Sequence, residues 1–228
     1  MPRRAESAQI PVEIPPSGII GDLTLPSGAA ALVLFAHGSG SSRFSSRNRY
    51  VAGVLQAAGL GTLLLDLLTP GEESIDERTT HLRFDIPLLA GRVVEATEWL
   101  TRNDETKGFE IGYFGASTGA AAALVAAAKL PAVVGAIVSR GGRPDLAGPA
   151  LPRVKAPTLL LVGSRDYQVI ELNETALSQL SCEKKLEIVP HATHLFEEPG
   201  TLEEVARLAA QWLQRYLSNR PVDRPANL

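Results

Sequence analysis

The chain has 228 residues, a formal net charge of −3 and a composition that is 45% hydrophobic and 21% charged. These values are typical of a globular protein, and without a long run of charge they argue against nucleic acid as the main partner. The single cysteine, Cys182, excludes an internal disulfide and a multi-thiolate metal site, and we expect no metal or organic cofactor. No apolar stretch suits a membrane span or a signal peptide, so we expect no membrane partner and a cytoplasmic location.

Short apolar segments alternate along the chain with longer segments of helical period. This alternation predicts an α/β fold whose mostly parallel sheet has about eight strands, with helices on both faces. The expected strands are residues 9–14, 18–25, 31–36, 62–66, 109–114, 133–139, 158–162 and 185–189, the first two forming a hairpin. The expected helices are residues 46–58, 88–102, 117–129, 169–180 and 202–217, and residues 67–76 are expected to form a polar loop.

We expect one domain over residues 1–228, because no repeat, low-complexity segment or clear linker divides the chain. The tail, residues 220–228, contains two prolines and is expected to be flexible. Residues 140–157 separate two predicted strands and are too few for a helical cap domain. The site should therefore be open to solvent, in a monomer or a homodimer.

The segment Gly115-Ala116-Ser117-Thr118-Gly119 lies where a predicted strand passes into a predicted helix. A serine on such a sharp turn projects above the carboxyl end of the sheet, and flanking glycines relieve crowding between strand and helix. The Thr118 amide at the helix start can point toward a developing oxyanion. Ser117 is therefore the candidate nucleophile.

A serine nucleophile needs a base, and the base needs an orienting acid, in the chain order Ser, Asp, His. Asp166 follows the strand at residues 158–162 and is preferred as the acid over Asp145, which follows the preceding strand. His194 and His191 both follow the strand at residues 185–189. His194 is preferred as the base because it lies further along the loop. The alternative for Asp166 is a turn or helix-cap residue.

The loop His37-Gly38-Ser39-Gly40 follows the strand at residues 31–36 and should supply a second oxyanion donor. The Ser39 amide is the first choice and Gly40 the next, and Gly40 is also expected to contact the substrate. His37 precedes the glycine and is expected to be a packed structural histidine.

Arginines are frequent in the loops of the predicted active face, and Arg140 and Arg143 are candidate contacts for a substrate carboxylate or phosphate. The alternative is that all are solvated loop charges, balanced by nearby acids. The remaining arginines are Arg43, Arg47, Arg49, Arg78 and Arg83, and the acids are Glu72, Glu73, Asp76, Glu77 and Asp85.

Segments spread over nearly the whole chain share a known pattern, among them HGSGSSRFSSRNRY, GYFGASTGAAAAL, LLLVGSRD and ATHLFEEPG. They resemble the dienelactone-hydrolase-like branch of the α/β-hydrolase superfamily. The resemblance implies a small bacterial protein with a Ser-Asp-His triad, which maps onto Ser117, Asp166 and His194. Some members of this branch carry a phosphoribosyltransferase domain, which is not expected in these residues.

The chain departs from dienelactone hydrolases proper, whose nucleophile is a cysteine. Cys182 lies before a strand and outside any such turn, so it cannot replace Ser117. His191 stands where the resemblance leads us to expect a small residue such as glycine.

We expect a serine hydrolase that cleaves small carboxylic esters through an acyl-enzyme, with lactones and thioesters as further candidates. One alternative is an acyltransferase or amidase that uses the same serine. Another is a non-catalytic protein of this fold that binds a ligand or partner. The intact order of Ser117, Asp166 and His194 argues against that second alternative, because a binding protein needs none of the three.

Overall fold

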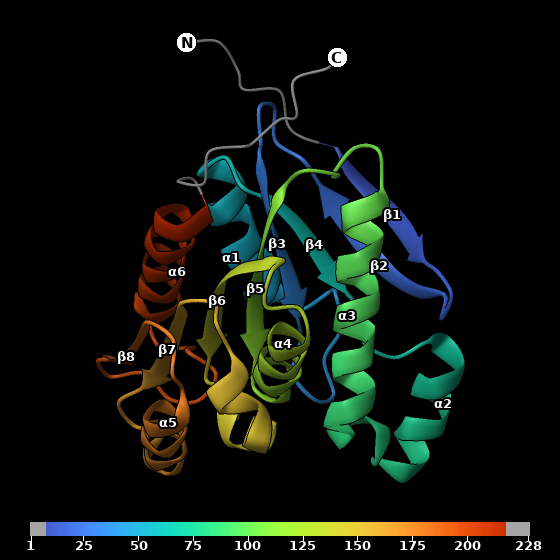
Figure 1. Ribbon diagram of the computed structural model, residues 1–228. Coiled ribbons are helices and arrows are strands. Elements are labelled where there is room, and N and C mark those ends of the chain that lie inside the picture. The colour runs from blue at the N-terminus through green and yellow to red at the C-terminus, as the bar shows by residue number, and fades with distance from the viewer. Residues whose placement is uncertain (1–7, 218–228) are drawn as a thin grey trace.

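The computed structural model describes residues 8–217, which contain an eight-stranded sheet in the order β1-β2-β4-β3-β5-β6-β7-β8 (Figure 1). Strand β2 is antiparallel to both of its neighbours, and all other neighbouring pairs are parallel. The strands are β1 (Gln9–Ile14), β2 (Ile19–Thr24), β3 (Ala31–Ala36), β4 (Gly61–Leu65), β5 (Glu110–Ala116), β6 (Val134–Arg140), β7 (Thr158–Gly163) and β8 (Lys184–Val189). The predicted α/β-hydrolase fold is confirmed, including the first hairpin. The tail predicted at residues 220–228 lies outside the described residues.

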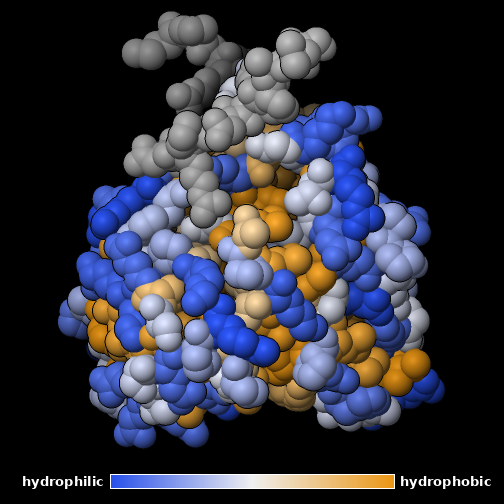
Figure 2. Space-filling view, viewed as in Figure 1, coloured by the Kyte–Doolittle hydropathy of each residue, from blue (hydrophilic) through white to orange (hydrophobic). Residues whose placement is uncertain are grey.

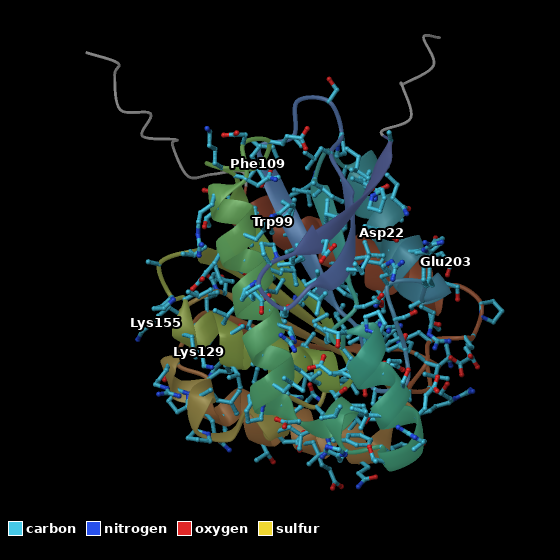
Figure 3. All side chains as sticks on the ribbon, turned by 90° about the vertical axis from the view of Figure 1, so that its right-hand side faces the viewer. Asp22, Trp99, Phe109, Lys129, Lys155 and Glu203 are labelled. Carbon is cyan, nitrogen blue, oxygen red and sulfur yellow. The ribbon has the colours of Figure 1, made fainter. Side chains whose placement is uncertain are left out.

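Helices cover the sheet in two layers, each with its own apolar core. Helices α3, α4 and α5 pack on one face, and α1 and α6 on the other. Figure 3 shows this arrangement edge-on, with Trp99 of α3 on one side of the sheet and Asp22 of β2 toward α1. The helices are α1 (Ser46–Ala57), α2 (Pro70–Thr79), α3 (Ile86–Arg102), α4 (Thr118–Lys129), α5 (Tyr167–Gln179) and α6 (Thr201–Leu217).

The central strands are buried on both faces, as their continuous apolar sequences predict. Every residue of β3 and of β6 is buried. All the predicted strands and the five predicted helices agree with the structure within two residues at each end.

The prediction of a polar loop at residues 67–76 is wrong, because helix α2 begins within this segment, at Pro70. Thr69 caps the helix by accepting a hydrogen bond from the Glu72 amide, and the Glu72 side chain accepts one from the Thr69 amide. Pro70 at the first helical position suits the same start. The Thr-x-x-Glu signal was therefore present in the sequence, but the dipeptide Pro70-Gly71 favoured a turn.

The segment between β6 and β7 is short and holds only irregular 3₁₀ turns, η2 (Pro144–Arg153). A second 3₁₀ turn, η1 (Leu82–Phe84), lies between α2 and α3. Figure 2 shows the face that carries α3 and α4, where hydrophobic residues are interspersed with hydrophilic ones. Within residues 8–217, no helix has the length and apolar character that a membrane crossing requires.

The start of α4 approaches the ends of β3 and β5 so closely that side chains are excluded there. A Cβ atom at Gly119 would overlap the carbonyl oxygens of Ala36 and His37, and one at Gly115 would lie 2.7 Å from the Ala120 amide nitrogen. The two glycines of the predicted turn therefore allow strand and helix to meet at backbone distance.

We expect Gly119→Ala to lower the free energy of unfolding by about 3 kcal/mol, because the new methyl group meets backbone rather than a movable side chain. The matched control is Gly91→Ala in α3, where an added Cβ meets nothing within 4 Å. That variant should gain up to about 1 kcal/mol from helix propensity. Urea unfolding of both variants measures the difference, and equal stability of the two would refute this account of the turn.

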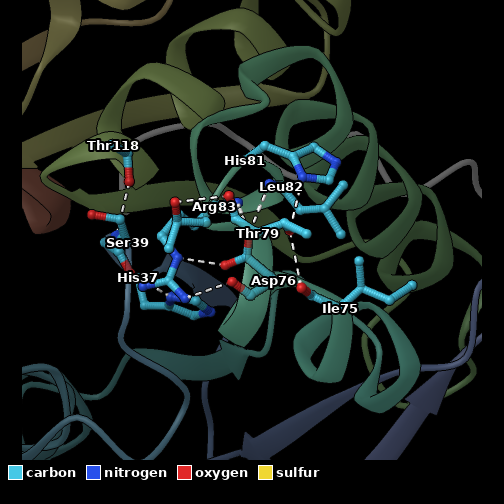
Figure 4. Close-up of polar contacts among 11 residues, drawn as sticks. His37, Ser39, Ile75, Asp76, Thr79, His81, Leu82, Arg83 and Thr118 are labelled. Carbon is cyan, nitrogen blue, oxygen red and sulfur yellow. Dashed lines mark hydrogen bonds and ion pairs between the residues drawn. The ribbon is translucent and has the colours of Figure 1, made fainter.

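His37, as predicted, is a packed structural histidine, and it joins the end of β3 to the chain after β4 (Figure 4). The Leu67 amide donates to His37 Nε2 at 3.1 Å, so the proton sits on Nδ1, which donates to the Gly38 carbonyl oxygen at 2.8 Å. Burial lowers the pKa of His37 below its ordinary value. The folded protein therefore favours the neutral imidazole.

This lowered pKa predicts a loss of stability as the pH falls through about 6.5, where the unfolded chain binds a proton that the folded chain resists. The loss should approach about 1.4 kcal/mol per pH unit until the folded histidine is also protonated. His37→Gln removes the titrating group, so urea unfolding of this variant should depend less steeply on pH between about 6.5 and 5. Parallel curves for the two proteins would contradict the expectation.

Candidate active site

The loops that follow β3, β5, β6, β7 and β8 carry the predicted site residues, and all meet at the carboxyl edge of the sheet. This edge is where open α/β sheets bind their ligands, because the loops there converge from neighbouring parallel strands.

Ser117 occupies the turn between β5 and α4 in a left-handed backbone conformation, with φ of 50° and ψ of −122°. Such angles are costly for a residue with a side chain, so the surroundings must hold them. The Ser117 amide donates to the Arg140 carbonyl oxygen at 3.2 Å, and the Ser117 carbonyl oxygen accepts from the Arg143 amide at 3.0 Å. The end of β6 and the loop after it therefore hold both the amide and the carbonyl group of Ser117.

Asp166 and His194 lie in direct contact: His194 Nδ1 is 2.6 Å from Asp166 Oδ2. Asp166 occupies the residue before α5, yet its carboxylate makes no capping hydrogen bond to the helix. The carboxylate faces the imidazole instead, so the alternative role as a helix cap does not fit. With the Nδ1 proton directed at the carboxylate, Nε2 is free to accept a proton.

The competing residues lie elsewhere. Asp145 forms a two-pronged pair with Arg143, at 2.9 and 2.8 Å, and not with a histidine. His191 is exposed, with φ of 65°, and its amide donates to Ser164 Oγ at 2.8 Å. A positive φ explains why a glycine is expected at position 191.

Ser117 and His194 line a common cavity of about 270 Å³. Among the described residues, no hydrogen bond joins the Ser117 hydroxyl to the His194 ring. Such bonds are often long in ligand-free sites and tighten when substrate binds. The cavity is lined by Gly38, Ser39, Ser41, Ser45, Arg47, Asn48, Ala116, Ser117, Arg140, His194 and Leu195.

The two predicted oxyanion donors differ in their surroundings. The Thr118 amide lies in the first turn of α4, where amides have no acceptor within the helix. The Ser39 amide donates to Thr118 Oγ1 at 2.9 Å (Figure 4), so it is engaged in this structure. The prediction of Ser39 as a free donor therefore does not fit this arrangement. The Thr118 side chain was not singled out from the sequence. By accepting this hydrogen bond, its hydroxyl connects the start of α4 to the loop after β3.

The three predicted substrate contacts lie in different places. Gly40 lines a small neighbouring cavity beside Arg83, which shares Gly38, Ser39 and Ser41 with the Ser117 cavity but is not lined by Ser117. Arg143 is absent from the lining of the Ser117 cavity and is paired with Asp145, which raises its pKa. Arg140 does line the cavity. The structure thus brings only Arg140 of these three to the nucleophile.

Asn48 also lines the cavity, and sequence analysis missed it. Its Oδ1 accepts a hydrogen bond from Arg140 at 3.4 Å. It is one of the buried positions of α1 with Val51, Ala52 and Leu55. An asparagine at helical spacing with these apolar residues is the signal that would have identified it. Within the described part of the chain, no group of His, Cys, Asp and Glu side chains is arranged to hold a metal ion.

Comparison with known proteins identifies the family of this chain. Residues 69–218 match the dienelactone hydrolase family. The crystal structure of a dienelactone hydrolase from Anabaena variabilis is 60% identical, with a TM-score of 0.91, and the match covers 94% of this chain and all of that one. The esterase Est1E from Butyrivibrio proteoclasticus shares the fold at 16% identity, with a TM-score of 0.76, over 93% of this chain and all of that one.

A curated protein of Mycobacterium tuberculosis, named "Putative phosphoribosyl transferase", is 55% identical over 216 residues. The match covers 95% of this chain but 47% of that protein, so the chain spans about half the length of this relative. The family match and the shared fold agree with the resemblance to dienelactone-hydrolase-like proteins that the sequence motifs indicate. The chain belongs to the dienelactone hydrolase family, a group of hydrolases with the α/β-hydrolase fold.

Proposed function

We propose that this protein is a serine esterase that cleaves small carboxylic esters, with Ser117 as the nucleophile, His194 as the base and Asp166 as the orienting acid. The contact between Asp166 and His194 carries the proposal. Because this contact occupies Nδ1 of His194, the other ring nitrogen, Nε2, is left for Ser117. Both residues line the same cavity, and Ser117 is held at a strained turn. A structural histidine would require neither the carboxylate nor the neighbouring serine.

In the proposed reaction, His194 Nε2 takes the proton of the Ser117 hydroxyl as Oγ attacks the ester carbonyl carbon. The tetrahedral intermediate collapses, the bond to the alcohol oxygen breaks, and the His194 imidazolium returns the proton to the leaving alcohol. Water then attacks the acyl-enzyme by the same route, which releases the acid and restores Ser117. Asp166 stabilises the imidazolium in both halves of the reaction.

The Thr118 amide is the oxyanion donor that this arrangement supports, because it lies one residue beyond the nucleophile at the positive end of α4. The hydrogen bond from Ser39 to the Thr118 hydroxyl would hold the start of α4 against the β3 loop. A second donor from that loop would require the Ser39 amide to exchange its partner when substrate binds.

The substrate should be small. The cavity holds about 270 Å³, the lower end for small-molecule sites. The segment between β6 and β7 contains only the 3₁₀ turns of η2 and no helical cap. Lactones are a further proposed substrate class, because a similar protein of known structure is a dienelactone hydrolase. The name phosphoribosyl transferase belongs to a longer relative. More than half of that relative lies outside the match with this chain.

Two matched pairs of variants test the proposed residues. Asp166→Asn should lower kcat for a short para-nitrophenyl ester by about 10³–10⁴-fold, because the imidazole loses its orienting charge. Asp145→Asn, which disturbs a carboxylate paired with Arg143, should leave kcat within a few-fold. In the second pair, His194→Ala should lower kcat by about 10⁴-fold or more and His191→Ala should not.

Circular dichroism and thermal unfolding of each variant establish that the fold is intact. If Asp145→Asn impaired hydrolysis as much as Asp166→Asn, or His191→Ala as much as His194→Ala, the assignment would be wrong. Wild-type protein without activity toward short esters, lactones or thioesters would reject the proposed function itself.

A further inference from the structure

Arg140 is buried beside the proposed nucleophile. It ends β6 at the position paired in register with Ala116, and its carbonyl oxygen accepts from the Ser117 amide. The residue is 8% exposed and lines the same cavity as Ser117 and His194. The backbone of Arg140 is therefore joined to the turn of the nucleophile, and the residue lines the cavity that contains Ser117.

The charge of Arg140 has no counter-ion among the residues that the structure describes. Within residues 8–217, no carboxylate oxygen lies within 4.0 Å of its guanidinium nitrogens. Within the same residues, the one hydrogen bond of its side chain goes to the neutral amide of Asn48 at 3.4 Å, and the buried Nε and Nη1 atoms have no partner. An isolated buried charge is costly, and proteins normally pair it.

The other loop arginines show that pairing is the rule on this face. Arg83 pairs with Asp76, and Arg143 pairs with Asp145. Arg43, Arg47 and Arg49 pair with Asp22, Asp66 or Glu197, and Arg78 is exposed. Five of the seven arginines singled out from the sequence are therefore paired and Arg78 is exposed, although only Arg83 pairs with one of the acids expected to balance them. Arg140 is neither paired with an acid nor exposed.

The rest of the cavity adds positive potential. Arg47 lines it, although its side chain also pairs with Glu197. After burial, Arg47 is the second cause that lowers the pKa of Arg140 to about 10, so Arg140 stays charged at neutral pH. Ser45, the N-cap of α1, also lines the cavity, and the first turn of α1 contains no acidic residue. The positive end of this helix dipole therefore meets the same space. No lining residue of the cavity is an aspartate or a glutamate.

We propose that Arg140 binds an anionic group of the substrate, a carboxylate or a phosphate, and that the enzyme therefore prefers esters that carry such a group near the scissile bond. This inference rests on the proposed function and specifies its substrate class. An oxyanion in the cavity would supply the missing counter-ion and relieve the repulsion between Arg140 and Arg47. Asn48 then acts as a positioning residue that orients the guanidinium group.

Paired substrates of equal length measure this preference: para-nitrophenyl hydrogen succinate and para-nitrophenyl butyrate. A third, the para-nitrophenyl ester of phosphonopropionate, tests phosphate-like chemistry. The wild type should have the higher kcat/KM on an anionic ester, and Arg140→Met should reduce the ratio of anionic to neutral kcat/KM by about 10–100-fold. Arg140→Lys, which keeps the charge, should retain part of the preference.

Arg143→Met is the matched control, because its guanidinium group is already paired with Asp145 and does not line the cavity. This variant should leave the ratio unchanged. Equal loss on charged and neutral esters in Arg140→Met, or the same change of ratio in Arg143→Met, would overturn the proposal.

A binding measurement separates this inference from the proposed function. In the Ser117→Ala protein, saturating succinate or inorganic phosphate should raise Tm by about 2–4 °C or more, and adding Arg140→Met should abolish the shift. A shift that depends on Arg140 supports the anion site even if the wild type hydrolyses no ester. Whether succinate, phosphate or both give it identifies the anion. No shift with either, or a shift that survives Arg140→Met, would overturn the proposal.

Discussion

The backbone of α4 begins against the ends of β3 and β5 with no room for a side chain at Gly115 or Gly119, and the site depends on this close approach. It forces Ser117 into a left-handed turn, whose amide and carbonyl are then tied to the loop after β6. It also brings Thr118 close enough for its hydroxyl to hold the Ser39 amide. Hydrogen bonds therefore connect the nucleophile turn, the β3 loop and the end of β6 into one unit, which holds Ser117 at its strained backbone angles.

Arg140 joins this unit through its backbone and keeps its side chain buried without an ionic partner among the described residues. Its carbonyl oxygen accepts from the Ser117 amide, and its side chain lies among buried groups at the end of β6. An uncompensated buried charge lowers stability, a cost that is common where a site is built for a ligand rather than for the empty protein. The paired arginines nearby, such as Arg83 with Asp76, hold loops in place. Arg140 differs from them because it is more buried, lines the Ser117 cavity and has no acidic partner within residues 8–217.

Much of the fold can be predicted from the sequence, because the spacing of apolar residues and the turn-forming residues determine the strands and helices locally. The strands, five helices and the Ser117 turn come from such patterns, and the order of Asp166 and His194 follows from the sheet. Helix α2 is not predicted, because two local signals compete at its start. Thr69 and Glu72 form a capping box, whereas Pro70-Gly71 favours a turn. The engagement of Ser39 and the isolation of Arg140 depend on partners far apart in the chain, so no local pattern reports them. Their recognition required the tertiary structure.

The central claim is that Ser117 is an activated nucleophile, and covalent labelling tests it most directly. The protein is incubated with a fluorophosphonate, digested, and the modified peptide is located by mass spectrometry. The account predicts one adduct, on Ser117, that forms much more slowly in Asp166→Asn and does not form in Ser117→Ala. A label on another residue, or the absence of labelling in wild-type protein that is correctly folded, would contradict it.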